Sequence, residues 1–190
     1  MPSSPRIVIR PVTRAEHRDA TRRWHSHHRP AQGERFALGA CLETDQRPLV
    51  AVVVMGTPPC EIDDGVTWEV SRLAVGPDAP PHTASRLLGA AGRLMVAAGV
   101  TLFISYTRVD ERGTCYLAAG WVPVAYVRGR DHTTGNRSLR WLPGLYEPTT
   151  ERIDRVRWER GARAPSRAPE VEWDGERWIR KKVDACPPRC

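Results

Sequence analysis

The spacing of apolar positions in the middle of the chain predicts two strands on either side of a helix. Residues 67–75 are rich in β-branched and aromatic side chains, as strands are. After a proline-rich loop, residues 84–97 carry apolar side chains at helical spacing, and residues 101–106 form a second apolar run. Strand, helix, strand is a βαβ unit, whose crossover helix implies two neighbouring parallel strands.

Other apolar runs predict the rest of the secondary structure. The expected strands cover residues 6–12, 34–43, 49–55, 122–127 and 137–142, and a short helix covers residues 114–119. Thr13 and Glu16 form a capping box, which predicts a helix that begins there and ends near Pro30. This order of elements indicates an α+β fold with a mixed central sheet of about six to seven strands, flanked by helices.

Regular patterning fades after Pro143. Residues 151–190 hold eleven basic and eight acidic side chains with scattered prolines, a composition that does not favour a packed core. Three tryptophans in this segment indicate short elements that dock on the domain or on a partner. We therefore divide the chain into a domain at residues 1–145 and a basic, partly irregular C-terminal extension at residues 146–190.

Composition and charge narrow the functional classes. The chain has 190 residues, 41% of them hydrophobic, and a formal net charge of +7. Residues 1–35 carry eight arginines against three acids, whereas residues 36–120 carry six against nine. Basic flanks around an acidic middle suit a polyanion, either coenzyme phosphates or nucleic acid. The alternative is compositional, because Lys181 and Lys182 are the only lysines and arginine use can reflect a GC-rich genome.

Membrane, disulfide and metal signals are weak. No apolar run reaches the length of a membrane span, and the amino terminus lacks a signal-peptide apolar region, so we expect a cytoplasmic protein. The five cysteines show no disulfide framework, which indicates reduced thiols. His25, His27 and His28 invite a metal hypothesis, but no cysteine or carboxylate completes a ligand spacing. Histidines that stabilise the C-terminal dipole of a helix are the alternative, and we predict no metal site.

The segment after the βαβ unit reads Tyr116-Leu-Ala-Ala-Gly120-Trp121. Strand, loop, helix, strand and this last motif resemble motifs A and B of the GNAT (Gcn5-related) N-acyltransferases, which bind acyl-coenzyme A. The resemblance covers residues 6–142 and implies a sheet splayed between its fourth and fifth strands, with acetyl-CoA or another acyl-CoA as cofactor. The loop departs from the family pattern Gln/Arg-x-x-Gly-x-Gly/Ala, since only Ala84 conforms.

This resemblance also implies roles for residues. The backbone of Leu73, Ala74 and Val75 would pair with the pantetheine amides. The helix N-terminus would bind the pyrophosphate through His82, Thr83, Ala84, Ser85 and Arg86. Tyr116 would protonate the departing thiolate, the alternative being a packed core tyrosine. Glu69 would act as general base, the alternative being an ion pair with Arg72.

A narrower resemblance concerns the substrate. Ser105-Tyr106, Asp110, Gly113-Thr114 and Ser71-Arg72-Leu73 are similar to segments of the phage Mom proteins, GNAT-related enzymes that modify adenine in DNA. It implies a catalytic role for a helix serine, here Ser85, and introduces iron as a further candidate cofactor. The residues that we place on the acceptor side are His28, Arg72, Tyr106 and Asp110.

The sequence therefore predicts an acyl-CoA-dependent N-acyltransferase that is a monomer or a homodimer, with a nucleobase in DNA as the Mom-like acceptor. An acetyltransferase of small amines or proteins is one alternative. A catalytically degenerate module that binds nucleic acid is another.

Overall fold

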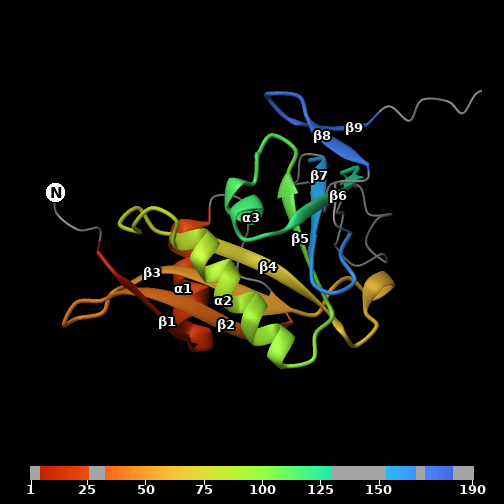
Figure 1. Cartoon of the computed structure of the whole chain (residues 1–190). Coiled ribbons are helices and arrows are strands. Elements are labelled where there is room, and N and C mark those ends of the chain that lie inside the picture. The colour runs from red at the N-terminus through yellow and green to blue at the C-terminus, as the bar shows by residue number, and fades with distance from the viewer. Residues whose placement is uncertain (1–4, 26–32, 130–152, 166–169, 182–190) are drawn as a thin grey trace, which may run out of the picture.

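A computed structural model describes residues 5–25, 33–129, 153–165 and 170–181 (Figure 1). The helices are α1 (Arg14–Trp24), η1 (Cys60–Ile62, a 3-10 turn), α2 (Thr83–Ala97) and α3 (Thr114–Ala118). The strands are β1 (Ile7–Pro11), β2 (Glu34–Leu42), β3 (Leu49–Gly56), β4 (Thr67–Val75), β5 (Leu102–Arg108), β6 (Val122–Val127), β7 (Arg155–Arg160), β8 (Val171–Trp173) and β9 (Trp178–Arg180).

Seven strands form one mixed sheet in the order β1-β2-β3-β4-β5-β7-β6. Strands β4 and β5 are parallel, and every other neighbouring pair in this sheet is antiparallel. Helix α2 connects the parallel pair, which confirms the predicted βαβ unit. Strands β8 and β9 form a separate hairpin. The α+β class and the seven-stranded sheet agree with the sequence-based expectation.

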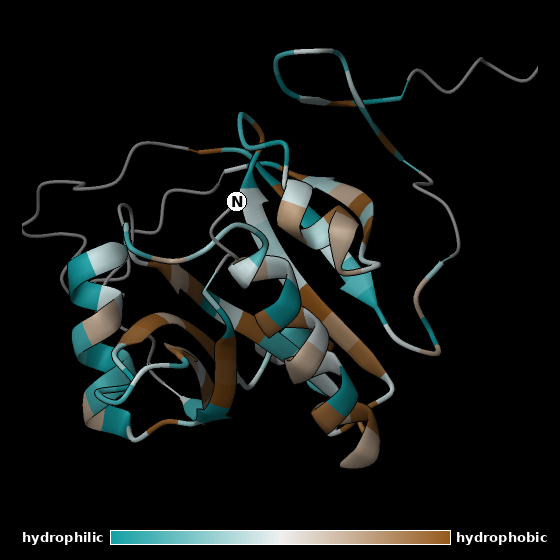
Figure 2. Cartoon of the chain, turned by 60° about the vertical axis from the view of Figure 1, so that its left-hand side comes forward, coloured by the Kyte–Doolittle hydropathy of each residue, from teal (hydrophilic) through white to brown (hydrophobic). Residues whose placement is uncertain are grey.

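Helices cover the two faces of the sheet and bury its centre. Helix α2 packs on one face through Leu87, Leu88 and Met95, whereas α1 lies on the opposite face with Ala20 against Val52 (Figure 1). Strand β3 is covered on both sides and is buried almost throughout, so it reads as a continuous apolar run. Hydrophobic residues are accordingly concentrated on the strands (Figure 2).

Helix α1 begins as predicted but ends earlier. The Thr13 hydroxyl accepts from the Glu16 N–H at 3.3 Å, and the Glu16 carboxylate accepts from the Thr13 N–H at 2.8 Å, which completes the capping box. The expected end near Pro30 is wrong, because the helix stops at Trp24 and His25 has extended backbone (φ −91°, ψ 112°). His25 and His28 therefore cannot share a face of this helix, and residues 26–32 lie outside the described part.

The seventh strand of the sheet, β7, comes from the segment that we expected to be an irregular extension. Strand β7 lies between β5 and β6 and pairs antiparallel with both. Residues 155–160 therefore belong to the central sheet and not to an irregular segment. The strand expected at residues 137–142 lies outside the described residues. The local signal for β7 is short, an alternation of charged and apolar residues from Arg155 to Trp158 within six residues of which four are charged.

Strand β4 carries the feature that opens the sheet. A β-bulge leaves Ser71 without a partner, since Val54 pairs with Arg72 and Met55 pairs with Val70. On its other edge β4 pairs with β5 over only four residues, and Val70↔Ser105 is the last pair. Beyond that pair β4 continues to Val75 and β5 continues to Arg108, so the two strands diverge. The predicted splay between the fourth and fifth strands is confirmed.

Candidate active site

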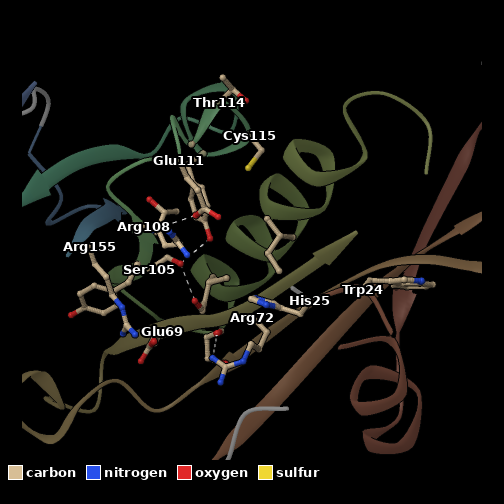
Figure 3. A pocket seen from close by; sticks show the side chains of 17 residues that line it. Trp24, His25, Glu69, Arg72, Ser105, Arg108, Glu111, Thr114, Cys115 and Arg155 are labelled. Carbon is tan, nitrogen blue, oxygen red and sulfur yellow. Dashed lines mark hydrogen bonds between the residues drawn. The ribbon is translucent and has the colours of Figure 1, made fainter. Parts of the chain in front are cut away.

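A cavity of about 350 Å³ lies where β4 and β5 separate (Figure 3). Strand β4 contributes Glu69 and Arg72, and β5 contributes Tyr106 and Arg108. Helix α3, the end of α1 and the first residue of β7 contribute the remaining walls. The further lining residues from these elements, from β5 and from the loop before α3 include Trp24, His25, Ser105, Glu111, Thr114, Cys115, Tyr116 and Arg155. The splay thus brings residues from five elements to one polar cavity.

Tyr116 is held rigidly at the inner wall of this cavity. Its ring stacks on Trp158 at a centroid distance of 5.4 Å and meets Trp121 edge-on at 5.3 Å. Its side chain is only 6% exposed, and its hydroxyl lies 2.8 Å from Oγ of Ser105. Burial raises the pKa of the Tyr116 phenol well above its usual range. The phenol therefore keeps its proton at neutral pH.

The direction of the hydrogen bond from Tyr116 follows from a second contact. Ser105 donates its hydroxyl proton to the carbonyl oxygen of Val70 at 2.9 Å. A serine hydroxyl has one proton, so its oxygen accepts from Tyr116 rather than donating to it. The same contact gives a partner to the Val70 carbonyl at the last β4–β5 pair. Ser105 consequently fixes both the point of the splay and the orientation of the Tyr116 proton.

Glu69 of β4 is one of two carboxylates that line this cavity, and Glu111 is the other. Burial raises the pKa of its carboxyl, and the positive charges of Arg72 and Arg155 oppose this rise only in part. Among the described residues Glu69 forms no ion pair and no hydrogen bond, so the alternative of a direct ion pair with Arg72 is not observed. A carboxyl of raised pKa that lines a cavity is a candidate general base.

Gly113 allows α3 to approach the ring that supports Tyr116. The residue has φ +68°, and a Cβ at this position would lie 2.3 Å from Cζ2 of Trp158. Only glycine accommodates both the left-handed conformation and the close approach. Trp158 is fully buried and donates its indole N–H to Oγ1 of Thr107 at 2.9 Å. Strand β7 is therefore the support on which α3 and its tyrosine rest.

The amino terminus of α2 presents free donors beside the splay. His82 adopts a left-handed conformation (φ 66°) that carries the chain from the proline loop into the helix. The N–H groups of His82, Ala84 and Ser85 have no hydrogen-bond partner among the described residues, while that of Thr83 bonds to Pro80. Free N–H groups and the positive end of the helix dipole together favour an anion at this end.

A second, open pocket extends from this helix terminus. Its cationic lining residues are Arg86 and Arg93 of α2 and Arg160 of β7, and none of the described residues that line it is acidic. Nη1 of Arg160 is buried and has no hydrogen-bond partner within the described residues. Burial, and next the charge of Arg93, lower the pKa of Arg160. Unneutralised guanidinium groups around an open pocket fit a phosphate-bearing ligand.

The structure brings half of the fourteen predicted site residues to one of these two pockets. Leu73, Arg72, Tyr106, Glu69 and Tyr116 line the first cavity, while Ser85 and Arg86 line the second. Ser85 donates to the His82 carbonyl at 3.0 Å and does not line the cavity of Tyr116 and Glu69. Its position therefore argues for the expected cofactor contact and against the expected catalytic role.

Other predicted residues are placed less favourably. Ala74 is buried against α1, and the side chain of Val75 is exposed, so only their backbone remains available. Asp110 does not line the cavity and forms an ion pair with Arg108 at 2.8 Å. His28 lies outside the described residues. Trp121, which ends the Tyr116–Trp121 motif, is 3% exposed and packs against Tyr116.

Sequence reasoning missed Ser105 as a site residue, together with Arg155, Arg108 and Glu111. A polar residue within the apolar run of β5 was the available signal for Ser105. Arg155 had no such signal, because its place depends on the insertion of β7 between β5 and β6.

Two features that bear on location and cofactors are not seen in the described part of the chain. No described helix combines the length and the apolar character needed to cross a bilayer. No three His, Cys, Asp or Glu side chains within the described residues gather as a metal site. His27 and His28 lie outside these residues.

Comparison with known proteins identifies the fold. No family model and no curated protein matches this sequence. Among solved structures, the ribosomal-protein-S18-alanine N-acetyltransferase from Escherichia coli matches with TM-score 0.55 and 16% identity, covering 83% of this chain and 94% of that one. A protein assigned to the GNAT acetyltransferase family from Desulfovibrio desulfuricans matches with TM-score 0.54 and 14% identity, covering 83% and 99%.

A third match was solved with its cofactor. YncA from Salmonella typhimurium, assigned as an acetyltransferase and bound to acetyl-CoA, has TM-score 0.57 and 11% identity, covering 82% of this chain and 94% of that one. At these identities the likeness concerns the backbone fold alone. The protein therefore has the GNAT fold.

Proposed function

We propose that this protein is an N-acyltransferase that uses acetyl-CoA or another acyl-CoA. The observation that carries the proposal is the cavity at the β4–β5 splay, which both Tyr116 and Glu69 line. The α2 terminus and the arginine-lined pocket fit the phosphates of a coenzyme A thioester. The solved matches of this fold are N-acetyltransferases, which supports the same conclusion.

Residues already described would hold the cofactor. The β4 backbone at Leu73–Val75 would pair with the pantetheine amides, because β4 has no strand neighbour on that edge beyond Val70. The N–H groups at the start of α2 and the side chains of Ser85 and Arg86 would contact the phosphates. When bound, the thioester supplies an activated acyl group.

The chain's own residues would manage the protons. Glu69 would take a proton from the acceptor ammonium, because its raised pKa brings the carboxyl nearer to the neutral range in which a base is effective. Tyr116 keeps its phenol proton, which it donates to Ser105 in this structure, and would turn that proton from Ser105 to the leaving sulfur. The net reaction breaks the C–S bond and forms a C–N bond. Of the two protons lost by the ammonium nitrogen, one ends on the thiol and one on solvent.

Isothermal titration calorimetry with acetyl-CoA tests the proposal. We expect saturable one-to-one binding in the wild type, weaker binding in Arg86→Gln, and unchanged binding in Arg6→Gln, a control on the exposed residue before β1. Absence of saturable binding in the wild type would refute it. Tyr116→Phe and Glu69→Gln should lose turnover while they retain cofactor binding. Full turnover in both variants would favour the alternative of a non-catalytic module.

A nucleobase in DNA as the acceptor, together with the Mom-like assignment, stays a prediction. Trp24 and Tyr106 line the cavity and are the two aromatic side chains on which an extruded base would stack. Binding to DNA should then weaken steeply as salt increases, because each neutralised phosphate releases counterions. Weak binding at low salt that does not change with salt would exclude this acceptor.

A further inference from the structure

The two-stranded hairpin β8–β9 packs beside the candidate site, although it is no part of the seven-stranded sheet. It lies against β6, and its Trp178 is buried (Figure 1). Val171 and Trp178 belong to the same apolar cluster as Tyr116 and Trp158. The hairpin therefore shares its core with the element that carries the candidate proton donor.

Two hydrogen bonds from Trp178 hold the loop that leads from β5 into α3. Its backbone N–H donates to the Val109 carbonyl at 2.8 Å, and its indole N–H donates to the Glu111 carbonyl at 3.1 Å. The loop ends at Gly113, the N-cap of α3, and Tyr116 lies in the first turn of that helix. One residue of the hairpin thus fixes the segment that sets the start of α3.

A row of aromatic rings also connects Trp178 to Tyr116. The ring of Trp178 meets Trp158 edge-on at a centroid distance of 5.4 Å. Trp158 in turn stacks on Tyr116 at 5.4 Å, with an interplanar angle of 21°. Trp158 is fully buried, and a densely packed interior transmits a displacement because it has little free space to absorb one. The position of Tyr116 therefore depends on Trp178 through the ring of Trp158 as well as through the loop.

The hairpin is built to hold Trp178 in one position. The Asp174 carboxylate closes its turn and accepts from two backbone N–H groups of that turn, at 2.8 and 2.9 Å. Trp173 pairs in register with Trp178 across the two strands. Farther along β9, the guanidinium carbon of Arg180 lies 5.6 Å from the ring centroid of Tyr126 in β6. The turn and the contact on β6 thus restrain the strand that carries Trp178.

We propose that Trp178 is a positioning residue for the acyl transfer, and that it acts through Tyr116, whose ring it holds at the cavity wall. This inference rests on the proposed acyltransferase function. A displacement of about 1 Å at a reacting group can cost about 100-fold in rate. The groups that would hold acetyl-CoA lie on β4 and at the start of α2, and the contacts of Trp178 described above involve neither element. Loss of Trp178 should therefore lower kcat without weakening acetyl-CoA binding.

Substitutions at two positions of β9 test this role. Trp178→Phe removes the indole hydrogen bond to Glu111 but keeps an aromatic ring beside Trp158, and it should lower kcat about 3- to 10-fold. Trp178→Ala removes the ring as well and should lower kcat about 30- to 100-fold. Both should keep the Kd for acetyl-CoA within about twofold. Arg180→Gln is the matched control, because it removes a contact of the same hairpin on β6, and its kcat should stay within about twofold of the wild type.

The assay follows the thiol released from acetyl-CoA. The acceptor is the amine that the wild type uses fastest among the common L-amino acids, spermidine, hydroxylamine and a single-stranded DNA oligonucleotide. A double-variant cycle with Tyr116→Phe then separates positioning from general destabilisation. Without the phenol proton, adding Trp178→Phe should lower the remaining kcat by less than about twofold. Equal losses in both backgrounds would show that Trp178 does not act through Tyr116 and would overturn the proposal.

Hydrogen–deuterium exchange gives a readout that needs neither cofactor nor acceptor. Peptides covering residues 109–119 should exchange faster in Trp178→Phe than in the wild type, and at the wild-type rate in Arg180→Gln. Unchanged exchange in Trp178→Phe would contradict the inference. Trp178→Phe keeps the test decisive where Trp178→Ala does not fold.

Two kinds of failure are distinguishable. If acetyl-CoA binds but Trp178→Phe turns over as fast as the wild type, the positioning role is wrong and the acyltransferase function stands. If acetyl-CoA does not bind to the wild type, the proposed function fails and the inference falls with it.

Discussion

Replacement of Ser105 by alanine would leave two buried polar groups without partners. The Tyr116 hydroxyl would lose its acceptor, and the Val70 carbonyl would lose the donor that satisfies it at the end of the β4–β5 pairing. Ser105 is 1% exposed and Tyr116 is 6% exposed, so water has little access to either orphaned group. Tyr116→Phe differs, because Ser105 keeps its hydrogen bond to Val70.

These contacts predict unequal losses of stability. Each buried group left unsatisfied costs about 1–3 kcal/mol, so Ser105→Ala should lower the free energy of unfolding by about 2–4 kcal/mol once the site relaxes. Tyr116→Phe removes one hydroxyl together with its hydrogen bond and should cost about 0.5–1.5 kcal/mol. The double variant leaves only the Val70 carbonyl unsatisfied. It should therefore be more stable than the sum of the single losses predicts, by about 1 kcal/mol.

Urea unfolding followed by tryptophan fluorescence measures all four proteins of this cycle, with Trp158 as a probe stacked on Tyr116. Ser85→Ala is the control, because that serine donates to His82 at an exposed position. We expect it to change stability by less than about 0.5 kcal/mol. If Ser105→Ala is no more destabilising than Tyr116→Phe, the assigned direction of the Tyr116 hydrogen bond is wrong.

Three further outcomes are expected. Gly113→Ala should lower stability by about 2 kcal/mol or more, because its Cβ would lie 2.3 Å from the ring of Trp158, and an unchanged melting temperature would contradict this packing. Glu69→Gln should lower kcat about 100-fold or more. It should also raise the free energy of unfolding at pH 7, because the amide removes a charge that burial penalises. A loss of stability in urea unfolding would show that the charges of the nearby arginines outweigh the effect of burial. A hydrogen bond from Arg10 lowers the pKa of Glu16 from its ordinary value of 4.5 to about 2, so its stabilising contribution is present above pH 4.5 and lost as the pH falls towards 2. The urea midpoints of wild type and Glu16→Gln should therefore converge across that range, and a constant difference would contradict the linkage.

Local patterning was sufficient for elements whose neighbours in sequence define them. The bounds of β4 and β6 agree with those predicted, and the capping box places the start of α1 after Thr13. These signals are local, because side-chain periodicity and capping involve residues within a few positions of each other. The end of α1 lacks such a signal in the histidine-rich segment, and there the prediction failed.

In the candidate site, too, some residues have a signal in the local sequence and others depend on long-range contacts. The resemblance carried by the βαβ unit and the short helix after it indicated Tyr116, Glu69 and the α2 terminus as candidates. Two relations are visible only in the folded chain. Ser105 orients the hydroxyl of Tyr116, and Arg155 lines the same cavity as Glu69. Arg155 reaches that cavity because β7 inserts between β5 and β6, a pairing with strands that lie 28 or more positions earlier in the chain. Long-range strand pairing is selected by the packing of the whole sheet. The local alternation of charged and apolar residues in β7 does not specify which strands it pairs with.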